Sequence, residues 1–255
     1  MKTLLAELIQ EPKAGLGQFF DASVALCRFL AGQHAAGVVL ERLLPQCISV
    51  DLHTEQVELG DPPSDLELCL PYMSPEQTGR LKAAADARSD LYSVGVVFYE
   101  LLTGELPFEA KDALGWSYAH TSLQPKSPAD LGPDIPQVIG EIVLKLLAKN
   151  PAERYQSAFS LQVDLERCRD EWLSTGSVAY FDLGQADSLR GIGRGGPLVG
   201  RDGELARLTE AFHRVCTGRT EIALVAGFPG TGKTALVEAF RRTDAAAKVD
   251  FVRGD

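Results

Sequence analysis

Apolar residues recur at three- and four-residue steps in several stretches, which is typical of helices that bury one face. This pattern predicts helices over residues 15–33, 89–103, 136–148 and 157–173. The stretch 89–103 carries apolar residues on more than one face, so we expect this helix to lie deep in a core. Gly104 follows it directly, at a position where helices commonly end on a left-handed residue.

Shorter apolar runs predict strands at 38–40, 47–50 and 56–59, with a polar turn at 51–54. A loop rich in proline and serine is expected over 122–136. Glycines crowd the region that follows the helix at 157–173, so we expect a linker over 174–196. Beyond it the pattern predicts a helix over 200–215 and a buried strand over 221–226.

Composition and charge narrow the class of protein. The 255 residues contain 25 Lys and Arg against 35 Asp and Glu, a net charge of −10, which disfavours DNA or RNA as the main partner. The 5 cysteines are odd in number and contain no C-x-x-C pair, so neither a disulfide framework nor a zinc knuckle is indicated. No apolar run reaches the ~18 residues that span a bilayer. We therefore expect a cytoplasmic protein in a reducing compartment.

The sequence GFPGTGKT at 227–234 matches the phosphate-binding pattern G-x-x-x-x-G-K-[ST] in full. It follows an apolar strand and precedes a predicted helix, so backbone N–H groups and the helix N-terminus would converge on one phosphate. Lys233 would reach the β- and γ-phosphates of ATP, and Thr234 would hold Mg²⁺. The expected nucleotide-binding residues are Gly227, Gly230, Thr231, Gly232, Lys233 and Thr234.

Hydrolysis needs more than this loop, because a P-loop ATPase also places an acidic residue for the metal on a later strand. Only one further strand, at 249–253, follows the loop in this sequence. We therefore expect a truncated ATPase module that does not hydrolyse nucleotide by itself.

Four blocks resemble the C-lobe of bacterial Ser/Thr protein kinases. They are YMSPEQTGR at 72–80, RSDLYSVG at 88–95, FYELLTG with LPF at 98–108, and LLAKNPAERY at 146–155. The succession of these blocks, PLVGRDGEL at 197–205 and the P-loop is similar to large bacterial hybrid sensors. In those proteins a kinase-like domain precedes an AAA-type ATPase, with sensor and histidine-kinase modules downstream.

The resemblance implies an α+β chain: a mainly helical protein-kinase-like C-lobe over 1–173 and a truncated P-loop α/β module over 197–255. It also implies scaffold roles for three residues. Glu76 would pair with Arg154, and Asp90 would tie down the backbone of the catalytic loop. The residues alone support a plainer interpretation, in which paired charges anchor a loop.

The family's catalytic loop carries a histidine–arginine–aspartate triplet, followed by a lysine and an asparagine. Aligning Gly37 and the apolar pair after it places Leu40-Glu41-Arg42 at the triplet, Leu44 at the lysine and Cys47 at the asparagine. Arg42 cannot accept a proton at neutral pH. Cys47 is a poor ligand for a hard cation such as Mg²⁺. We therefore assign no catalytic residue in this lobe.

Two further residues lie near this loop in the sequence or in the alignment. Asp61 aligns with the family's metal-binding aspartate, but Pro62-Pro63 follows it, which favours a solvated turn. His34 has no partner in view, and we expect it to be structural or exposed. No G-x-G-x-x-G or Val-Ala-Ile-Lys stretch precedes the C-lobe blocks, so the lobe that holds ATP in a kinase is expected to be missing.

The sequence thus favours a signalling protein of the kinase/ATPase hybrid type. It would bind ATP through the P-loop, while the kinase-like lobe would be inactive and serve docking of a protein partner or regulation. The alternative is a fragment of an active Ser/Thr protein kinase that phosphorylates proteins using ATP. Whether the chain is an enzyme is left open by the sequence.

Overall fold

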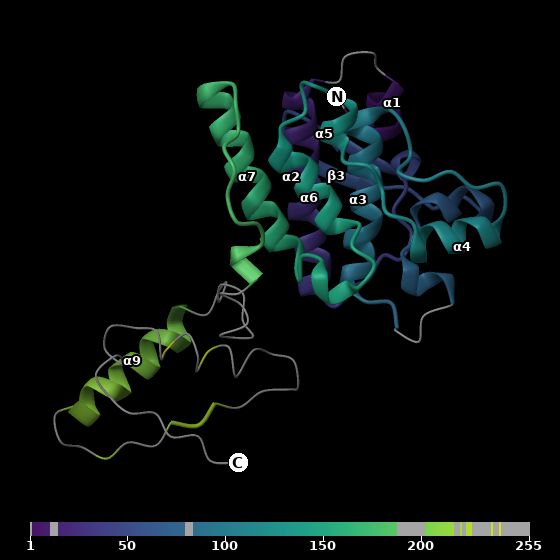
Figure 1. Cartoon of the computed structure of the whole chain (residues 1–255). Coiled ribbons are helices and arrows are strands. Elements are labelled where there is room, and N and C mark those ends of the chain that lie inside the picture. The colour runs from purple at the N-terminus through teal and green to yellow at the C-terminus, as the bar shows by residue number, and fades with distance from the viewer. Residues whose placement is uncertain are drawn as a thin grey trace. The chain divides into compact units, whose positions relative to one another are not determined.

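A computed structural model describes residues 2–10, 15–79, 84–187 and 202–216, together with isolated positions at 220, 223–225, 236 and 240. The chain divides into two units, Met1–Asp187 and Ser188–Asp255. Each is considered by itself (Figure 1). The P-loop at 227–234 lies outside the described residues.

The first unit is mainly helical. Its α-helices are α1 (Leu5–Gln10), α2 (Leu16–Ala35), α3 (Ala87–Thr103), α4 (Ala113–Ser122), α5 (Pro128–Leu131), α6 (Gln137–Leu146) and α7 (Ala158–Thr175). Short 3-10 helices are η1 (Pro45–Cys47), η2 (Leu66–Tyr72), η3 (Pro75–Thr78) and η4 (Pro151–Glu153). In the second unit the described helix is α9 (Asp202–Cys216). None of the described helices has the length and apolar content needed to cross a membrane.

A small antiparallel sheet accompanies these helices. Its strands are β1 (Lys2–Leu4), β2 (Ile48–Asp51) and β3 (Gln56–Leu59), in the order β1-β2-β3. Lys2 lies opposite Asp51, and Val50 lies opposite Val57. Ile48 and Val50 on β2 are fully buried, as expected for alternate residues of a strand that faces a core.

The apolar core is built around α3, which packs against α2 and α6, while α2 packs along α7 (Figure 1). The side chain of Asp86 caps the first turn of α3 by accepting from the backbone N–H of Arg88. Gly104 ends the helix with a φ of 73°, which glycine adopts at little cost. A Cβ at Gly95 would lie 2.7 Å from the Cβ of Leu146, so glycine permits the close approach of α3 and α6.

The structure confirms the mainly helical architecture and the helices predicted from periodicity, with ends that differ by a few residues. The predicted strands at 47–50 and 56–59 correspond to β2 and β3. Other expectations were wrong. Residues 38–40 form no strand, and the predicted loop at 122–136 contains α5. The sequence pattern gave no prediction of β1, α1 or α4.

The expected linker also differs from the structure. Residues 174–187 belong to the first compact unit, and the Phe181 side chain in this stretch is 6% exposed and packs into the core. In the second unit, the predicted helix at 200–215 corresponds to α9. The predicted strand at 221–226 is described only at 223–225, where no strand is present.

Candidate functional site

The loop that joins α2 to η1 is held by one buried carboxylate. Asp90 lies in the first turn of α3 and is 1% exposed. Its Oδ2 accepts from the backbone N–H of Leu40 at 2.9 Å, and its Oδ1 accepts from that of Glu41 at 2.8 Å. Within residues 38–40, the N–H of Leu40 is therefore bonded to a side chain, and the N–H of Val38 is bonded to the carbonyl oxygen of Gln33 at 3.0 Å. Neither donor is left for a strand ladder, which explains why this stretch forms no strand.

His34, near the end of α2, contacts the same carboxylate. Its Nε2 lies 2.9 Å from Oδ2 of Asp90, and its side chain is 10% exposed. The other ring nitrogen, Nδ1, is buried without a hydrogen-bond partner among the described residues. Because Asp90 offers only acceptors, Nε2 carries the proton. The sequence did not indicate this contact, since the two residues are 56 positions apart.

The anchored loop carries Arg42 and leads to Cys47, which contacts Asp61. Arg42 is exposed. Cys47 is buried, and its thiol donates to the carbonyl oxygen of Asp61 at 3.5 Å. Burial raises the pKa of the Cys47 thiol, and the neighbouring Cys69 and Asp61 raise it further. Of the three side chains, only the carboxylate of Asp61 offers a cation an anionic oxygen at neutral pH.

A buried ion pair connects η3 to the loop after α6. Arg154 donates from Nη1 to Oε1 of Glu76 at 2.7 Å and from Nη2 to Oε2 at 3.0 Å. The two side chains are 0% and 1% exposed. Ser89 on α3 also donates to Glu76, at 2.7 Å. The structure thus brings together Glu76 and Arg154, the two residues of the scaffold pair. With Ser89, this ion pair joins η3, α3 and the loop after α6.

Arg154 is saturated by acceptors. Beyond Glu76 it donates to the backbone carbonyls of Ala148 at 2.8 Å, Arg88 at 2.9 Å and Lys149 at 3.2 Å. Burial acts to raise the pKa of Glu76, but hydrogen bonds and charge from Arg154, together with the Ser89 hydroxyl, hold that pKa below its ordinary value. A fully hydrogen-bonded geometry of this kind offsets the desolvation cost of two buried charges.

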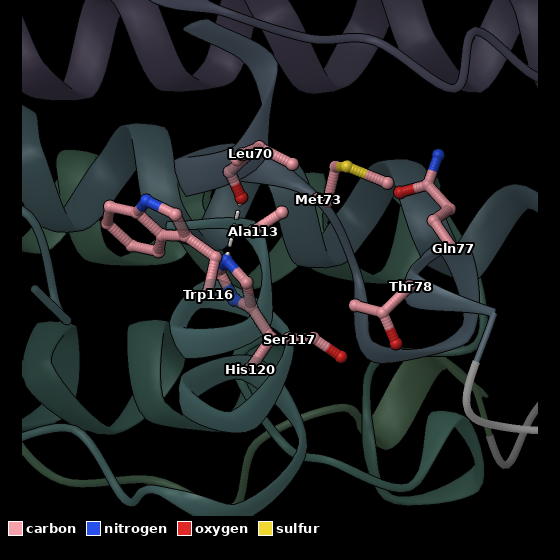
Figure 2. A pocket seen from close by; sticks show the side chains of 8 residues that line it. All are labelled: Leu70, Met73, Gln77, Thr78, Ala113, Trp116, Ser117 and His120. Carbon is pink, nitrogen blue, oxygen red and sulfur yellow. Dashed lines mark hydrogen bonds between the residues drawn. The ribbon is translucent and has the colours of Figure 1, made fainter. Parts of the chain in front are cut away.

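A pocket of about 130 Å³ opens beside η2, η3 and α4 (Figure 2). It is lined by Leu70, Met73, Gln77, Thr78, Ala113, Trp116, Ser117 and His120. Most of this lining is apolar. The hydroxyl of Ser117 is buried and has no hydrogen-bond partner among the described residues. Gln77 closes one side and donates to the carbonyl oxygen of Glu41 at 2.6 Å, which connects the pocket to the loop held by Asp90.

His120 forms the buried wall of the pocket and is 0% exposed. Its Nε2 lies 2.9 Å from the carbonyl oxygen of Leu70, as Figure 2 shows, and its Nδ1 lies 3.0 Å from the hydroxyl of Tyr92. Since a carbonyl only accepts, Nε2 is the protonated nitrogen and Tyr92 donates to Nδ1. Burial lowers the pKa of His120 to about 4, with a smaller lowering from the charge of Lys149.

The predicted nucleotide site cannot be placed on the structure, because Gly227, Gly230, Thr231, Gly232, Lys233 and Thr234 lie outside the described residues. Their role, and that of Thr234 toward Mg²⁺, stay predictions. Within the described part of the chain, no group of three or more His, Cys, Asp or Glu side chains could hold a metal ion.

Two family models match separate parts of the chain. Residues 53–164 match the family model of the protein kinase domain, and residues 197–255 match that of the AAA ATPase domain. The chain therefore carries protein kinase sequence followed by AAA ATPase sequence. The first match begins after the loop Leu40–Cys47, so the alignment of Arg42 and Cys47 with catalytic positions stays a prediction.

Two relatives are similar to parts of this chain. The chain is 36% identical over 204 residues to the hybrid signal transduction histidine kinase G of Dictyostelium discoideum, which covers 72% of this chain and 6% of that protein. It is 44% identical over 102 residues to the serine/threonine-protein kinase PksC of Streptomyces coelicolor, which covers 40% of this chain and 17% of the kinase. The chain thus spans a small part of either relative.

Glu76→Gln is expected to lower the free energy of unfolding of the first unit by about 3 kcal/mol, because Arg154 would stay buried without its counter-charge. Urea denaturation followed by circular dichroism measures this. The matched control is Glu58→Gln, which removes the exposed partner of Lys2 and should cost less than about 1 kcal/mol. Equal effects of the two substitutions would contradict the assigned role of the buried pair.

The pKa of His120 predicts a pH dependence. Its folded pKa of about 4 lies below the ordinary value of 6.5, so the unfolded chain binds more protons between these values. The free energy of unfolding should fall by up to about 3 kcal/mol as the pH drops from 6.5 through 4.

Urea titrations across this pH range test the point. His120→Gln should reduce the loss of stability between pH 6.5 and 4, while His53→Gln, at an exposed position, should leave the slope unchanged. A His120→Gln profile parallel to that of the unsubstituted protein would show that His120 is not the group responsible.

Proposed function

We propose that this chain is the kinase-to-ATPase junction of a signalling protein whose kinase-like lobe does not transfer phosphate. The lobe would bind a protein partner, and the P-loop would bind ATP with Mg²⁺. One observation carries the proposal. Asp90 fixes the start of the loop Leu40–Cys47. This loop carries the exposed Arg42 and the buried Cys47 at the positions that the alignment assigns to proton acceptor and metal ligand.

The chemistry of these two side chains opposes phosphoryl transfer. A kinase needs an acceptor for the substrate hydroxyl proton and oxygen ligands for the metal ions that neutralise the phosphates. The guanidinium of Arg42 has no acceptor capacity. The Cys47 thiol is buried, with a pKa raised by that burial, and a neutral thiol is a poor ligand for Mg²⁺.

The names of the relatives suggest two functions for this lobe. The hybrid histidine kinase G is named for signal transduction, and PksC is named as a serine/threonine-protein kinase. An active kinase of the second kind, phosphorylating proteins with ATP, is the competing function. The identity of Arg42 speaks against it, while the retained pair of Glu76 and Arg154 is compatible with both.

Nucleotide binding is expected to depend on Lys233. Titration calorimetry of the full chain with Mg-ATP should give a saturating heat of binding, and Lys233→Ala should weaken binding at least tenfold because the phosphates lose their cation. Lys248→Ala, in the same ATPase sequence, serves as the control and should bind as before. Saturable binding that survives Lys233→Ala would place the nucleotide elsewhere.

The partner-binding role is supported by two of the elements that line the pocket. Both η2 and α4 also expose large apolar side chains: Leu66, Leu68, Leu114 and Tyr118. The exposed charged residues in these stretches of the chain are mostly acidic: Asp65, Glu67, Glu109 and Asp112, with Lys111. A small, partly apolar pocket favours one inserted apolar side chain. The carboxylates favour basic flanking residues.

The expected ligand is thus a short basic segment with one apolar anchor. Peptides selected from a phage-displayed random library on the full chain should carry this pattern. Ala113→Arg, which places a bulky cation in the pocket lining, should weaken the selected peptides at least tenfold by fluorescence anisotropy. Ser122→Arg, near the other end of α4, is the control and should have a small effect. Equal weakening by both variants would argue against the pocket.

A further inference from the structure

The segment after α7 is bound along the helix that precedes it. Gly176 ends α7 with a φ of 73°, and the chain then runs back along the helix, as the trace beside α7 in Figure 1 shows. We call residues 177–187 the strap. Near its start, the backbone N–H of Ala179 donates to Oε1 of Glu171 at 3.0 Å. At its end, Asp187 lies beside the N-terminus of the same helix.

An apolar anchor fixes the middle of the strap. Phe181 is 6% exposed and belongs to the core, while its neighbour Tyr180 is 69% exposed. The guanidinium of Arg167 on α7 lies 4.0 Å from the centroid of the Phe181 ring, a distance typical of a cation–π contact. Val178 and Leu183 pack partly against the core on either side. Three apolar side chains of the strap therefore pack against the core, with Phe181 the most deeply buried.

Two carboxylates connect the strap to the loop that contains η4. Oδ2 of Asp164 accepts from the backbone N–H of Gly184 at 2.7 Å and from the hydroxyl of Tyr155 at 2.7 Å. Asp187 accepts from the backbone N–H of Gln156 at 2.9 Å and from the hydroxyl of Ser157 at 3.3 Å. The strap thus holds Gln156 and Ser157 directly, and its Gly184 shares the Asp164 carboxylate with Tyr155.

On its other side the same loop holds Glu76 of η3. Arg154, next to Tyr155, makes the bidentate pair with Glu76. Gln156 accepts from Nη1 of Arg88 at 3.2 Å, and its amide donates to the carbonyl oxygen of Arg154 at 2.7 Å. Residues 154–157 therefore lie between the strap and the groups that position η3 and α3.

We propose that the strap is a releasable clasp, bound in cis, whose docking on α7 stabilises the loop that holds Glu76. Release of the strap withdraws acceptors from Gln156 and Ser157 and frees the Asp164 carboxylate from Gly184. The loop around Arg154 then loses its support on one side, and the Glu76 pair opens more often. The second unit begins at residue 188. A force that displaces the chain at this point therefore acts first on the contacts of Asp187.

Hydrogen–deuterium exchange of the full chain, read by mass spectrometry, tests the clasp. Phe181→Ala and Asp187→Ala should each raise exchange about tenfold in peptides covering 148–157 and 74–79, as well as in the strap. Tyr180→Ala and Asp182→Ala are the matched controls. They remove exposed side chains of the same kinds, and exchange should match that of the unsubstituted protein.

The hairpin of β2 and β3 provides an internal reference, because the strap makes none of the contacts described above with it. Its exchange should not change in Phe181→Ala or Asp187→Ala. Two outcomes would overturn the proposal: faster exchange confined to the strap, or an equal rise in the hairpin and in 74–79. The second would mean that the strap contributes only general stability. Asp187→Ala keeps the aromatic anchor, so it tests the clasp even if Phe181→Ala does not fold.

Discussion

The carboxylate of Asp90 is the group on which the candidate site depends. It is buried in the first turn of α3 and receives hydrogen bonds from two backbone N–H groups and from His34. A buried carboxylate with its oxygens satisfied in this way is costly to move, because any displacement leaves a charge without partners. The loop from Leu40 onward therefore has its backbone path set by α3 rather than by its own side chains.

The first turn of α3 makes further hydrogen bonds that hold neighbouring segments. Ser89, next to Asp90, donates to Glu76, and the carbonyl of Arg88 accepts from Arg154. One helical turn thus positions the loop Leu40–Cys47, the η3 segment and the loop after α6. This arrangement separates two properties of the lobe. The buried groups preserve its shape, while in the proposed function the exposed Arg42 decides what the loop can do chemically.

Much of the scaffold could be predicted from the sequence, because apolar periodicity marks α2, α3, α6 and α7. The resemblance to kinases also selected Glu76, Asp90 and Arg154, which lie in short blocks with specific spacing. The strand expected at 38–40 failed for a definite reason. The N–H of Leu40 bonds to Asp90, a residue 50 positions away, and local apolar pattern carries no information on such a contact.

The strap was missed for a related reason. The glycines that predicted a linker over 174–196 lie mostly after residue 187, and the strap itself contains only Gly184. Two of its side chains, Phe181 and Asp187, supply most of its anchoring contacts. The contacts of His34 and Gln77 likewise join residues far apart in the sequence. Long-range polar pairs of this kind depend on how helices pack, and a pattern of neighbouring residues does not reveal them.

Transfer of radiolabelled phosphate from γ-labelled ATP measures the central claim most directly. The full chain is incubated with Mg²⁺ and a generic acceptor protein, beside Arg42→Ala and Asp61→Asn. The account predicts no metal-dependent incorporation above that of a sample without the chain, and the same result for both variants. Robust incorporation by the unsubstituted chain that is abolished by Asp61→Asn would contradict it, since the lobe would then hold a working phosphotransfer site.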